Sequence, residues 1–278
     1  MSILNALVFG FIQGLTEYIP VSSSAHLQVL FSLFGLNSTG FNTETFVAFA
    51  HFGTIIGAVI LYFKDFGEIL FQSLEFAAST GVPQGKSRTK FPSVRLLIMM
   101  IFSSIPLLLV LPLNGYIRSL NNNTAFIGIM LILTGTLLSI SDQFIEGSKG
   151  ERSVGISDAI IIGLCQAVSA LPGISRTGTV YTAGIATGLT RSFAAKFAVI
   201  SSVPVLFISN IVRLIRAVST SFSWADLGPC FAGMASSVLG SILAIRIFLN
   251  LVQSRHFRNV GYYCWVAGVL AIILTMIF

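Results

Sequence analysis

Polar side chains with catalytic chemistry interrupt an apolar stretch near the start of the chain, in the segment QGLTEYIPVSSSAH. Gln13 and Glu17 are four residues apart, so they share one face of a helix. Three consecutive serines and His26 follow within ten residues. A carboxylate, hydroxyl groups and an imidazole are the types used in acid–base and nucleophilic catalysis. Because burying a carboxylate in an apolar medium is costly, this segment is a candidate catalytic site.

The proline and the serines of this segment predict a break between two short helices. Pro20 ends the first helix, and Ser22, Ser23 or Ser24 can cap the second. His26 then lies in the first turn of the new helix. The serines are either caps alone or also ligands and nucleophiles of a site.

A second polar break occurs in PGISRTGT, far along the chain. Pro172 and Gly173 predict a turn, and Ser175 or Thr177 can cap the helix that follows. Arg176 therefore lies at the beginning of a helix. A guanidinium group there offers paired donors beside free backbone N–H groups and the positive end of the helix dipole. This arrangement is typical of a phosphate site.

The composition of the whole chain predicts a polytopic membrane protein. Of its 278 residues 54% are hydrophobic and only 9% are charged, and mean hydropathy is +0.89. Repeated apolar stretches of about 20 residues predict transmembrane helices. Six such spans are expected, at residues 44–63, 94–113, 123–142, 193–212, 227–250 and 260–278.

Two further apolar segments, 2–33 and 156–189, contain the polar breaks, and each half is too short to span a bilayer. We therefore expect two re-entrant helix-turn-helix segments. Both read Gly-x-x-Gln, then apolar residues, Pro and Ser, and each precedes three spans. The prediction is a single integral membrane domain, 1–278, with repeat one at about 1–142 and repeat two at about 156–278. Three spans per repeat invert the second copy, so the breaks meet near the midplane.

The cations predict the orientation, because cytoplasmic loops of membrane proteins are rich in Lys and Arg. One side of the predicted topology carries only Arg118, Arg213 and Arg216. The other side carries Lys64, Lys86, Arg88, Lys90, Arg95, Lys149, Arg152, Arg191, Lys196, Arg246, Arg255 and Arg258. We expect this second side to be cytoplasmic and both termini to be outside. The sequence has no basic arm, so nucleic acid binding is not expected.

Other polar residues and the cysteines have weaker signals. His51 either lines the cavity or packs in the core. Lys64, Arg191 and Lys196 are expected to be anchors at the membrane interface. The three cysteines lie in apolar runs without metal-ligand spacing, which indicates small buried hydrophobic residues.

The two breaks together resemble the signature regions of the bacterial undecaprenyl-diphosphate phosphatase family, of the bacitracin-resistance type. The similarity extends over the whole chain, including FVAFAHFGT. The residues that carry it are Gln13, Glu17, Pro20, Ser22, Ser23, Ser24 and His26 in the first region, and Pro172, Gly173, Ser175 and Arg176 in the second. Ala25 replaces a usual Gly and Thr177 a usual Ser. Val180 stands where the family has Thr, which leaves the role of that position open.

The resemblance implies hydrolysis of undecaprenyl diphosphate to undecaprenyl phosphate and inorganic phosphate, which recycles the lipid carrier for cell-wall synthesis and confers bacitracin resistance. It also implies a divalent cation, Mg²⁺ or Ca²⁺, and a site open to the outer face of the bacterial cytoplasmic membrane. The catalytic residues on this interpretation are Glu17, His26, Ser23 and Arg176, with Glu17 also binding the metal. The substrate-binding residues are Gln13, Ser22, Ser24, Gly173, Ser175, Arg176 and Thr177.

Several alternatives stay open from the sequence. His26 acts as base or nucleophile, Ser23 is the rival nucleophile, and water is the third. Because inverted repeats with broken helices also suit alternating access, the rival function is a lipid-phosphate transporter or flippase. A homodimer is left open.

Overall fold

The computed structural model describes residues 1–36, 42–78, 91–121, 123–221 and 224–277, which form helices joined by turns. A lone bridge joins Lys149 and Leu189. In chain order the helices are α1 (Ile3–Tyr18), α2 (Ser23–Leu33), α3 (Thr43–Leu61), α4 (Phe63–Ala78), α6 (Pro92–Ser104), the 3-10 helix η2 (Ile105–Leu113), α7 (Asn114–Leu120), α8 (Thr124–Ser141), α9 (Ile156–Val168), α10 (Arg176–Ala186), α11 (Arg191–Ser221), the 3-10 helix η3 (Trp224–Asp226), α12 (Leu227–Ser254) and α13 (Phe257–Ile277).

The prediction of six spans and an all-helical membrane fold is confirmed. In the described residues, the helices long and apolar enough to cross a membrane are Thr43–Leu61, Pro92–Ile117, Thr124–Ser141, Arg191–Ala217, Trp224–Ser254 and Phe257–Thr275. The chain is therefore a multi-pass membrane protein. The fourth and fifth spans are longer than predicted because polar residues at their ends continue the helices beyond the apolar stretches.

The second span is not one regular α-helix. α6 passes into η2, and Pro106 and Pro112 lie within this 3-10 segment. Proline has no N–H to donate to the preceding turn, so regular α-helical bonding is lost there. Because hydropathy is uniform along residues 94–113, the hydropathy pattern did not predict this change from α-helix to 3-10 helix.

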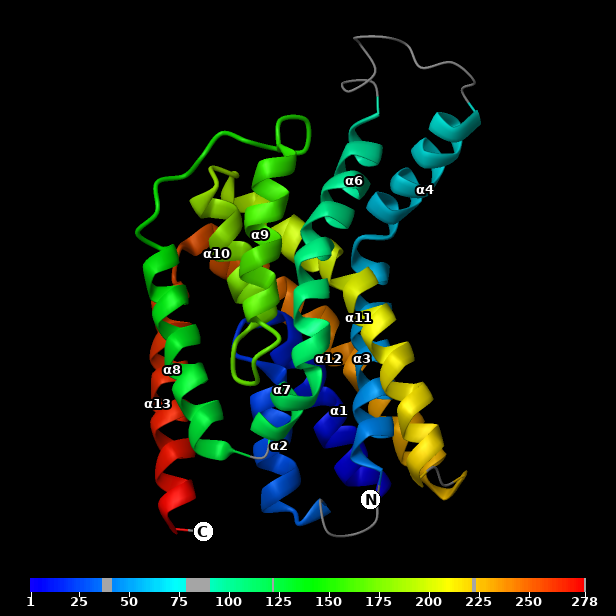
Figure 1. Cartoon of the computed structure of the whole chain (residues 1–278), viewed down its shortest axis with the longest axis vertical. Helices are drawn as coiled ribbons and strands as arrows, with labels where there is room; N and C mark the ends of the chain where they lie inside the picture. Colours follow the sequence, from blue (N-terminus) through cyan, green and yellow to red (C-terminus); the bar gives the residue numbers. More distant parts are fainter. Residues whose placement is uncertain (37–41, 79–90, 122, 222–223, 278) are drawn as a thin grey trace.

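The two interrupted segments each form a helical hairpin, and the hairpins come from opposite ends of the bundle (Figure 1). α1 and α2 begin and end near the chain termini, whereas α9 and α10 begin and end at the other end. Both tips lie near the middle of the bundle (Figure 1). At 16 and 13 residues, α1 and α9 are shorter than the roughly 20 residues that a bilayer requires. This arrangement brings the two polar breaks together.

Close helix pairs hold the hairpins in place. α1 packs along α12, α8 along α13, α3 against α11 and α12, and α9 against α6 and η2. A Cβ added to Gly10 would lie 2.1 Å from the Gly233 carbonyl oxygen, so α1 and α12 meet backbone to backbone. Pairs such as α8 with α13 join corresponding elements of the two proposed repeats. The division into repeats stays a prediction.

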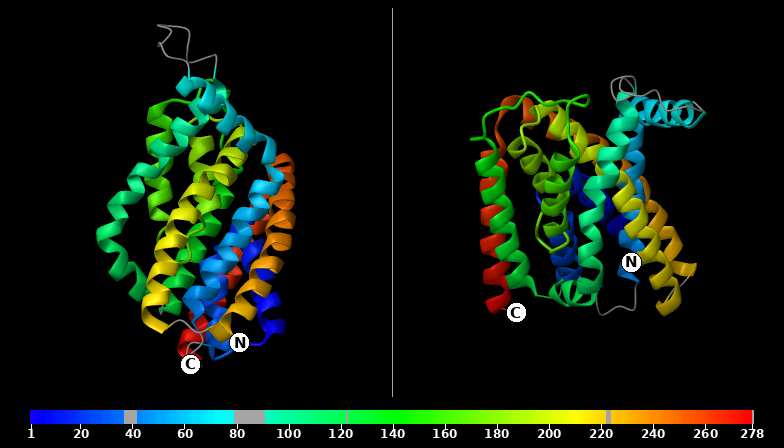
Figure 2. Two further views of the ribbon diagram at one scale, coloured as in Figure 1. Left: turned by 90° about the vertical axis from the view of Figure 1, so that its right-hand side faces the viewer. Right: turned by 45° about the horizontal axis from the view of Figure 1, so that its top comes forward.

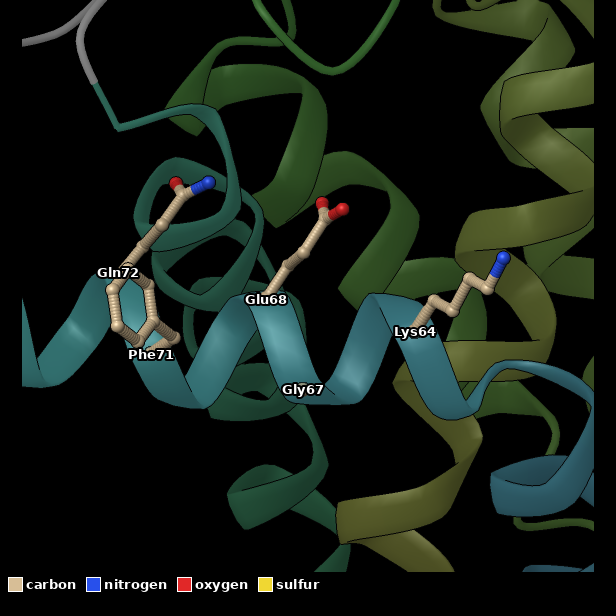
Figure 3. A pocket seen from close by; sticks show the side chains of 5 residues that line it. All are labelled: Lys64, Gly67, Glu68, Phe71 and Gln72. Atoms are coloured by element: carbon tan, nitrogen blue, oxygen red, sulfur yellow. The ribbon is translucent and has the colours of Figure 1, made fainter.

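α4 is a helix that the sequence pattern did not predict, and it projects from the bundle at the end opposite the termini (Figure 2). One side is exposed and apolar, with Phe63, Leu70, Phe71 and Leu74. An open hollow of 340 Å³ runs along the helix, and Lys64, Glu68 and Gln72 extend to the same side there (Figure 3). This hollow contains no predicted site residue.

The loops 142–155 and 254–257, which carry Lys149, Arg152 and Arg255, lie at the end opposite the two termini (Figure 1), as the predicted topology requires. Lys86, Arg88 and Lys90, which were also predicted for this side, lie outside the described residues. Lys196 forms ion pairs with Asp65, at 2.5 Å, and with Glu151, at 3.1 Å. It therefore joins α11 to α4 and to the loop 142–155.

The expectation that Arg191 is an interface anchor is wrong. Its side chain is buried, with only 3% exposed, and Nη2 donates to the carbonyl oxygens of Ser141, Asp142 and Phe144 at 3.0–3.3 Å. These carbonyls end α8, where a cation offsets the negative end of the helix dipole. Arg191 thus fixes the start of α11 to the end of α8.

We predict that Gly10→Ala destabilises the protein, because the new methyl group overlaps the Gly233 carbonyl. Overpacking of this kind costs about 1–3 kcal/mol. Gly67→Ala is the matched control, since that α4 glycine has nothing within 4 Å of the added Cβ. Thermal unfolding of the two purified variants measures the difference. Equal midpoints would show that α1 and α12 are not in close contact.

Candidate active site

Glu17 is the centre of a buried hydrogen-bond cluster. Its side chain is on α1, the residue is 8% exposed, and Gln13 beside it is fully buried. The Glu17 Oε2 atom accepts from Gln13 Nε2 at 2.8 Å and from Ser23 Oγ at 2.7 Å. His51 Nε2, from α3, lies 3.4 Å from the same oxygen. Three helices therefore contribute side chains around one carboxylate.

The turn between α1 and α2 places Ser23 against Glu17. α1 ends at Tyr18, and the Val21 N–H donates to the Ile19 carbonyl across Pro20 at 2.7 Å. Ser22 has φ +67°, a left-handed conformation that is unusual outside glycine. Such backbone strain gathers at functional sites. It turns the chain so that α2 begins at Ser23, directly beside the end of α1.

The expectation that a serine hydroxyl caps α2 is wrong. Ser22 occupies the N-cap position, but its hydroxyl makes no capping hydrogen bond and pairs with the Ser24 hydroxyl at 3.2 Å. Ser23 points to Glu17 instead. A carboxylate competes well for a hydroxyl donor because charge-assisted hydrogen bonds are stronger than neutral ones. The serines therefore build the site rather than the helix end.

The second hairpin follows the predicted local chemistry. Gly173 has φ +100°, and a Cβ there would lie 2.6 Å from the Ile127 carbonyl oxygen of α8. Only glycine suits both the conformation and the close approach. Ser175 caps α10, because its hydroxyl accepts from the Gly178 N–H at 3.2 Å. Thr134 of α8 joins the turn, donating to the Gly173 carbonyl at 2.9 Å.

One hydrogen bond joins the two hairpin tips. The Thr177 hydroxyl, in the first turn of α10, donates to the Glu17 main-chain carbonyl at 2.8 Å. Pro20 lies against Gly178, with its Cβ 3.1 Å from the position of an added methyl group. The Arg176 guanidinium is near enough to act electrostatically on the Glu17 carboxylate. The predicted meeting of the two breaks is therefore present.

Three buried polar atoms at this junction have no hydrogen-bond partner among the described residues. They are Nε and Nη1 of Arg176 and Oε1 of Gln13. Unpaired buried donors and acceptors are costly, and each is a place where a ligand can bind. The guanidinium donors suit an anion, and the amide oxygen suits a cation.

The residues at Glu17 fit a hard divalent cation. No cluster of three or more His, Cys, Asp or Glu side chains able to hold a metal occurs in the part of the chain that the structure describes. Mg²⁺, however, is commonly held by one or two protein oxygens together with substrate phosphates. The Glu17 carboxylate and the unpaired Gln13 oxygen supply such ligands beside the anion donors of Arg176.

His26 has a different environment from Glu17. Its Nδ1 atom lies 2.8 Å from the Ser22 carbonyl oxygen, and its Nε2 atom lies 2.6 Å from the hydroxyl of Tyr263 on α13. The ring stacks on Tyr263, with centroids 5.7 Å apart and planes at 10°. His26 is thus at the side of the site nearest α13.

Sequence reasoning ranked His51 too low and did not identify Tyr263 or Thr134. The residue pattern gave no signal for Tyr263, which lies 237 positions from His26. His51 is a polar residue within an apolar stretch of sequence, as Glu17 and His26 also are, and this is the feature that could have identified it. Val180, the departure from the family motif, is buried in a hydrophobic cluster that also contains Tyr18 and Val21.

The fold and the junction define a multi-pass helical membrane protein with an ionisable site buried inside its bundle. The family model described as "Bacitracin resistance protein BacA" matches residues 6–270, and the chain belongs to this family. The "Undecaprenyl-diphosphatase" of Idiomarina loihiensis is 35% identical over 280 residues and 100% of both chains. Its namesake in Methanobrevibacter smithii is 34% identical over 277 residues, or 97% of this chain and 96% of the relative.

We predict that Thr177→Val weakens the junction, because it removes the hydrogen bond to the Glu17 carbonyl at nearly constant volume. A typical net loss is about 0.5–1.5 kcal/mol, and more if the carbonyl stays unpaired. Thr179→Val is the control on the same helix, since that hydroxyl donates only within α10, to the Ser175 carbonyl. Thermal unfolding compares the variants. A larger loss in Thr179→Val would contradict the proposed importance of the junction.

Proposed function

We propose that this protein hydrolyses undecaprenyl diphosphate to undecaprenyl phosphate and inorganic phosphate, recycling the lipid carrier for cell-wall synthesis and conferring bacitracin resistance. The observation that carries the proposal is the meeting of Arg176, with unpaired guanidinium donors, and the Glu17 cluster inside a membrane bundle. A diphosphate on an apolar chain needs a buried anion site that lipid can reach. The relatives' printed names agree with this activity.

The anion site is built from Arg176 and the beginning of α10. The guanidinium supplies paired donors, and the helix N-terminus adds free N–H groups and a favourable dipole. Gly173 and Ser175 shape this turn, while Gln13, Ser22, Ser24 and Thr177 complete the wall around the phosphates. Phosphoryl transfer depends mainly on positioning and on neutralising charge, which these groups supply.

The Glu17 carboxylate and the Gln13 amide oxygen would hold a divalent cation, Mg²⁺ or Ca²⁺. When bound, the ion neutralises charge on the diphosphate and polarises its oxygens. The support for this assignment is the hard oxygen chemistry of these two side chains next to Arg176.

The geometry favours Ser23 over His26 as the nucleophile. The Ser23 hydroxyl already donates to Glu17 at 2.7 Å, so the carboxylate can accept its proton as the oxygen attacks the terminal phosphorus. Undecaprenyl phosphate leaves, and water then cleaves the phosphoserine to release inorganic phosphate. His26 is placed to act as the base for that water.

We infer that the two hairpins are re-entrant and that the protein lies in the bacterial cytoplasmic membrane. The shortness of α1 and α9 supports the first point. The cations on the loops opposite the termini support a cytoplasmic position for that end. Both termini are then outside, and the α1–α2 hairpin opens the site toward the outer face.

A phosphate-release assay tests the function. Purified protein in detergent, given undecaprenyl diphosphate, is expected to release phosphate, and Glu17→Ala is expected to lose at least about a hundredfold in rate. Chelation of divalent cations should stop release, and Mg²⁺ or Ca²⁺ should restore it. Gly67→Ala, remote from the junction, serves as the control. Absence of release by wild type, with lipid movement in vesicles, would instead support the transporter function, which the relatives' names do not favour.

Trapping of a phosphoenzyme tests the nucleophile. With substrate labelled at the terminal phosphate and a rapid quench in denaturant at neutral pH, which preserves both phosphoserine and phosphohistidine, we expect the label on the peptide that contains Ser23. Ser23→Ala should abolish labelling, whereas Ser32→Ala should retain it, because Ser32 is exposed near the far end of the same helix. Label on His26 would assign the nucleophile there. Label on neither residue would indicate direct attack by water.

A further inference from the structure

The two ring nitrogens of His26 have partners of different kinds. The Ser22 carbonyl can only accept a hydrogen bond, so Nδ1, 2.8 Å away, must carry the proton. In the neutral ring Nε2 then has a lone pair, which accepts from the Tyr263 hydroxyl at 2.6 Å. The two contacts together select one tautomer and one ring orientation.

The contact with Tyr263 also holds after the ring gains a proton. A phenol oxygen both donates and accepts, so it can accept from a protonated Nε2. The stacked rings limit rotation of the imidazole in both states. Tyr263 therefore suits a histidine that must take up and release a proton at Nε2 without moving.

The packing of α13 on α8 fixes the position of Tyr263. A Cβ on Gly261 would lie 2.3 Å from Ser139 Oγ, and one on Gly268 would lie 2.5 Å from the Gly128 carbonyl oxygen. The Trp265 indole N–H donates to the Ile132 carbonyl at 3.2 Å. These contacts set the rotation of α13 about its axis. Because α2 also contacts α8, the positions of the Tyr263 hydroxyl and of His26 are both set by packing against α8.

We propose that Tyr263 is a proton relay of the phosphatase site: its hydroxyl gives its proton to Nε2 of His26 while its oxygen takes the proton of the attacking water. The inference rests on the proposed function, because it assigns to His26 the base role described above. Tyr263 then contacts the attacking water, and the proton that it passes on is held by the His26 ring.

Tyr263→Phe tests the proposal, since it keeps the stacked ring and removes only the hydroxyl. We expect kcat to fall about tenfold or more, part of the usual contribution of a general base, while KM changes less than about twofold. Tyr262→Phe is the matched control. Its residue is adjacent on α13 and equally exposed, at 49% against 50%, and its ring contacts Trp265 and not His26. Equal kcat in the two variants would overturn the proposal.

Two further measurements separate a proton relay from a structural effect. In a His26→Gln background, the added Tyr263→Phe change should cost nothing more, because the ring that receives the proton is gone. The chain has three histidines, so ¹⁵N-labelled histidine gives few signals, and Tyr263→Phe should shift the Nε2 signal of His26 alone. An unchanged His26 signal, or an undiminished loss in the His26→Gln background, would contradict the inference.

These outcomes are distinct from failure of the proposed function. A wild-type protein that releases no phosphate would remove the phosphatase assignment, whereas the ¹⁵N signals would still report whether Tyr263 holds the His26 ring. Release by wild type with no difference between Tyr263→Phe and Tyr262→Phe would leave the phosphatase intact and remove the relay role of Tyr263. Unfolding midpoints of the two phenylalanine variants, expected to be alike, show that neither change acts through the fold.

Discussion

The structure depends on satisfying polar groups where apolar surroundings leave no water to do so. Each hairpin tip interrupts a helix and so frees main-chain carbonyls and N–H groups inside the bundle. The Thr177 hydroxyl supplies a partner for the Glu17 carbonyl, and Thr134 supplies one for Gly173. Each tip thus has a main-chain carbonyl satisfied by another element. The buried Glu17 carboxylate is tolerable at this junction for the same reason, because Gln13 and Ser23 donate to it.

Close backbone approach is the second condition, because it keeps the supporting helices from rotating. Glycines bring α1 onto α12 and α13 onto α8, so the side chains between them have one possible direction. Glu17 then faces Ser23 of α2 and His51 of α3, and Tyr263 faces His26. Arg191 closes the other end of α8 by binding its last carbonyls. The precision of the site comes from these contacts more than from the residues that would meet substrate.

Much of this could be predicted from local sequence. Apolar length gave the six spans, and Pro20 and Pro172 gave the two breaks, since proline acts on its immediate neighbours. The interpretation of Ser175 as a cap was right because a cap is a local bond. The prediction of a serine cap on α2 was wrong because the Ser23 hydroxyl donates to the Glu17 carboxylate and the Ser22 hydroxyl pairs with Ser24. The positions of His51 and Tyr263 depend on packing between distant helices, which no local pattern encodes.

The bond between Thr177 and Glu17 has a consequence for how the molecule is made. Glu17, Ser23 and His26 leave the ribosome early. The guanidinium that would clamp a phosphate belongs to a segment about 150 residues later in the chain. Because synthesis adds roughly five residues per second or more, this segment follows after a delay of seconds. A nascent chain that ends before α10 holds the proposed nucleophile without the proposed anion clamp. The complete site can therefore form only late in translation, after the α1–α2 and α9–α10 hairpins have packed together.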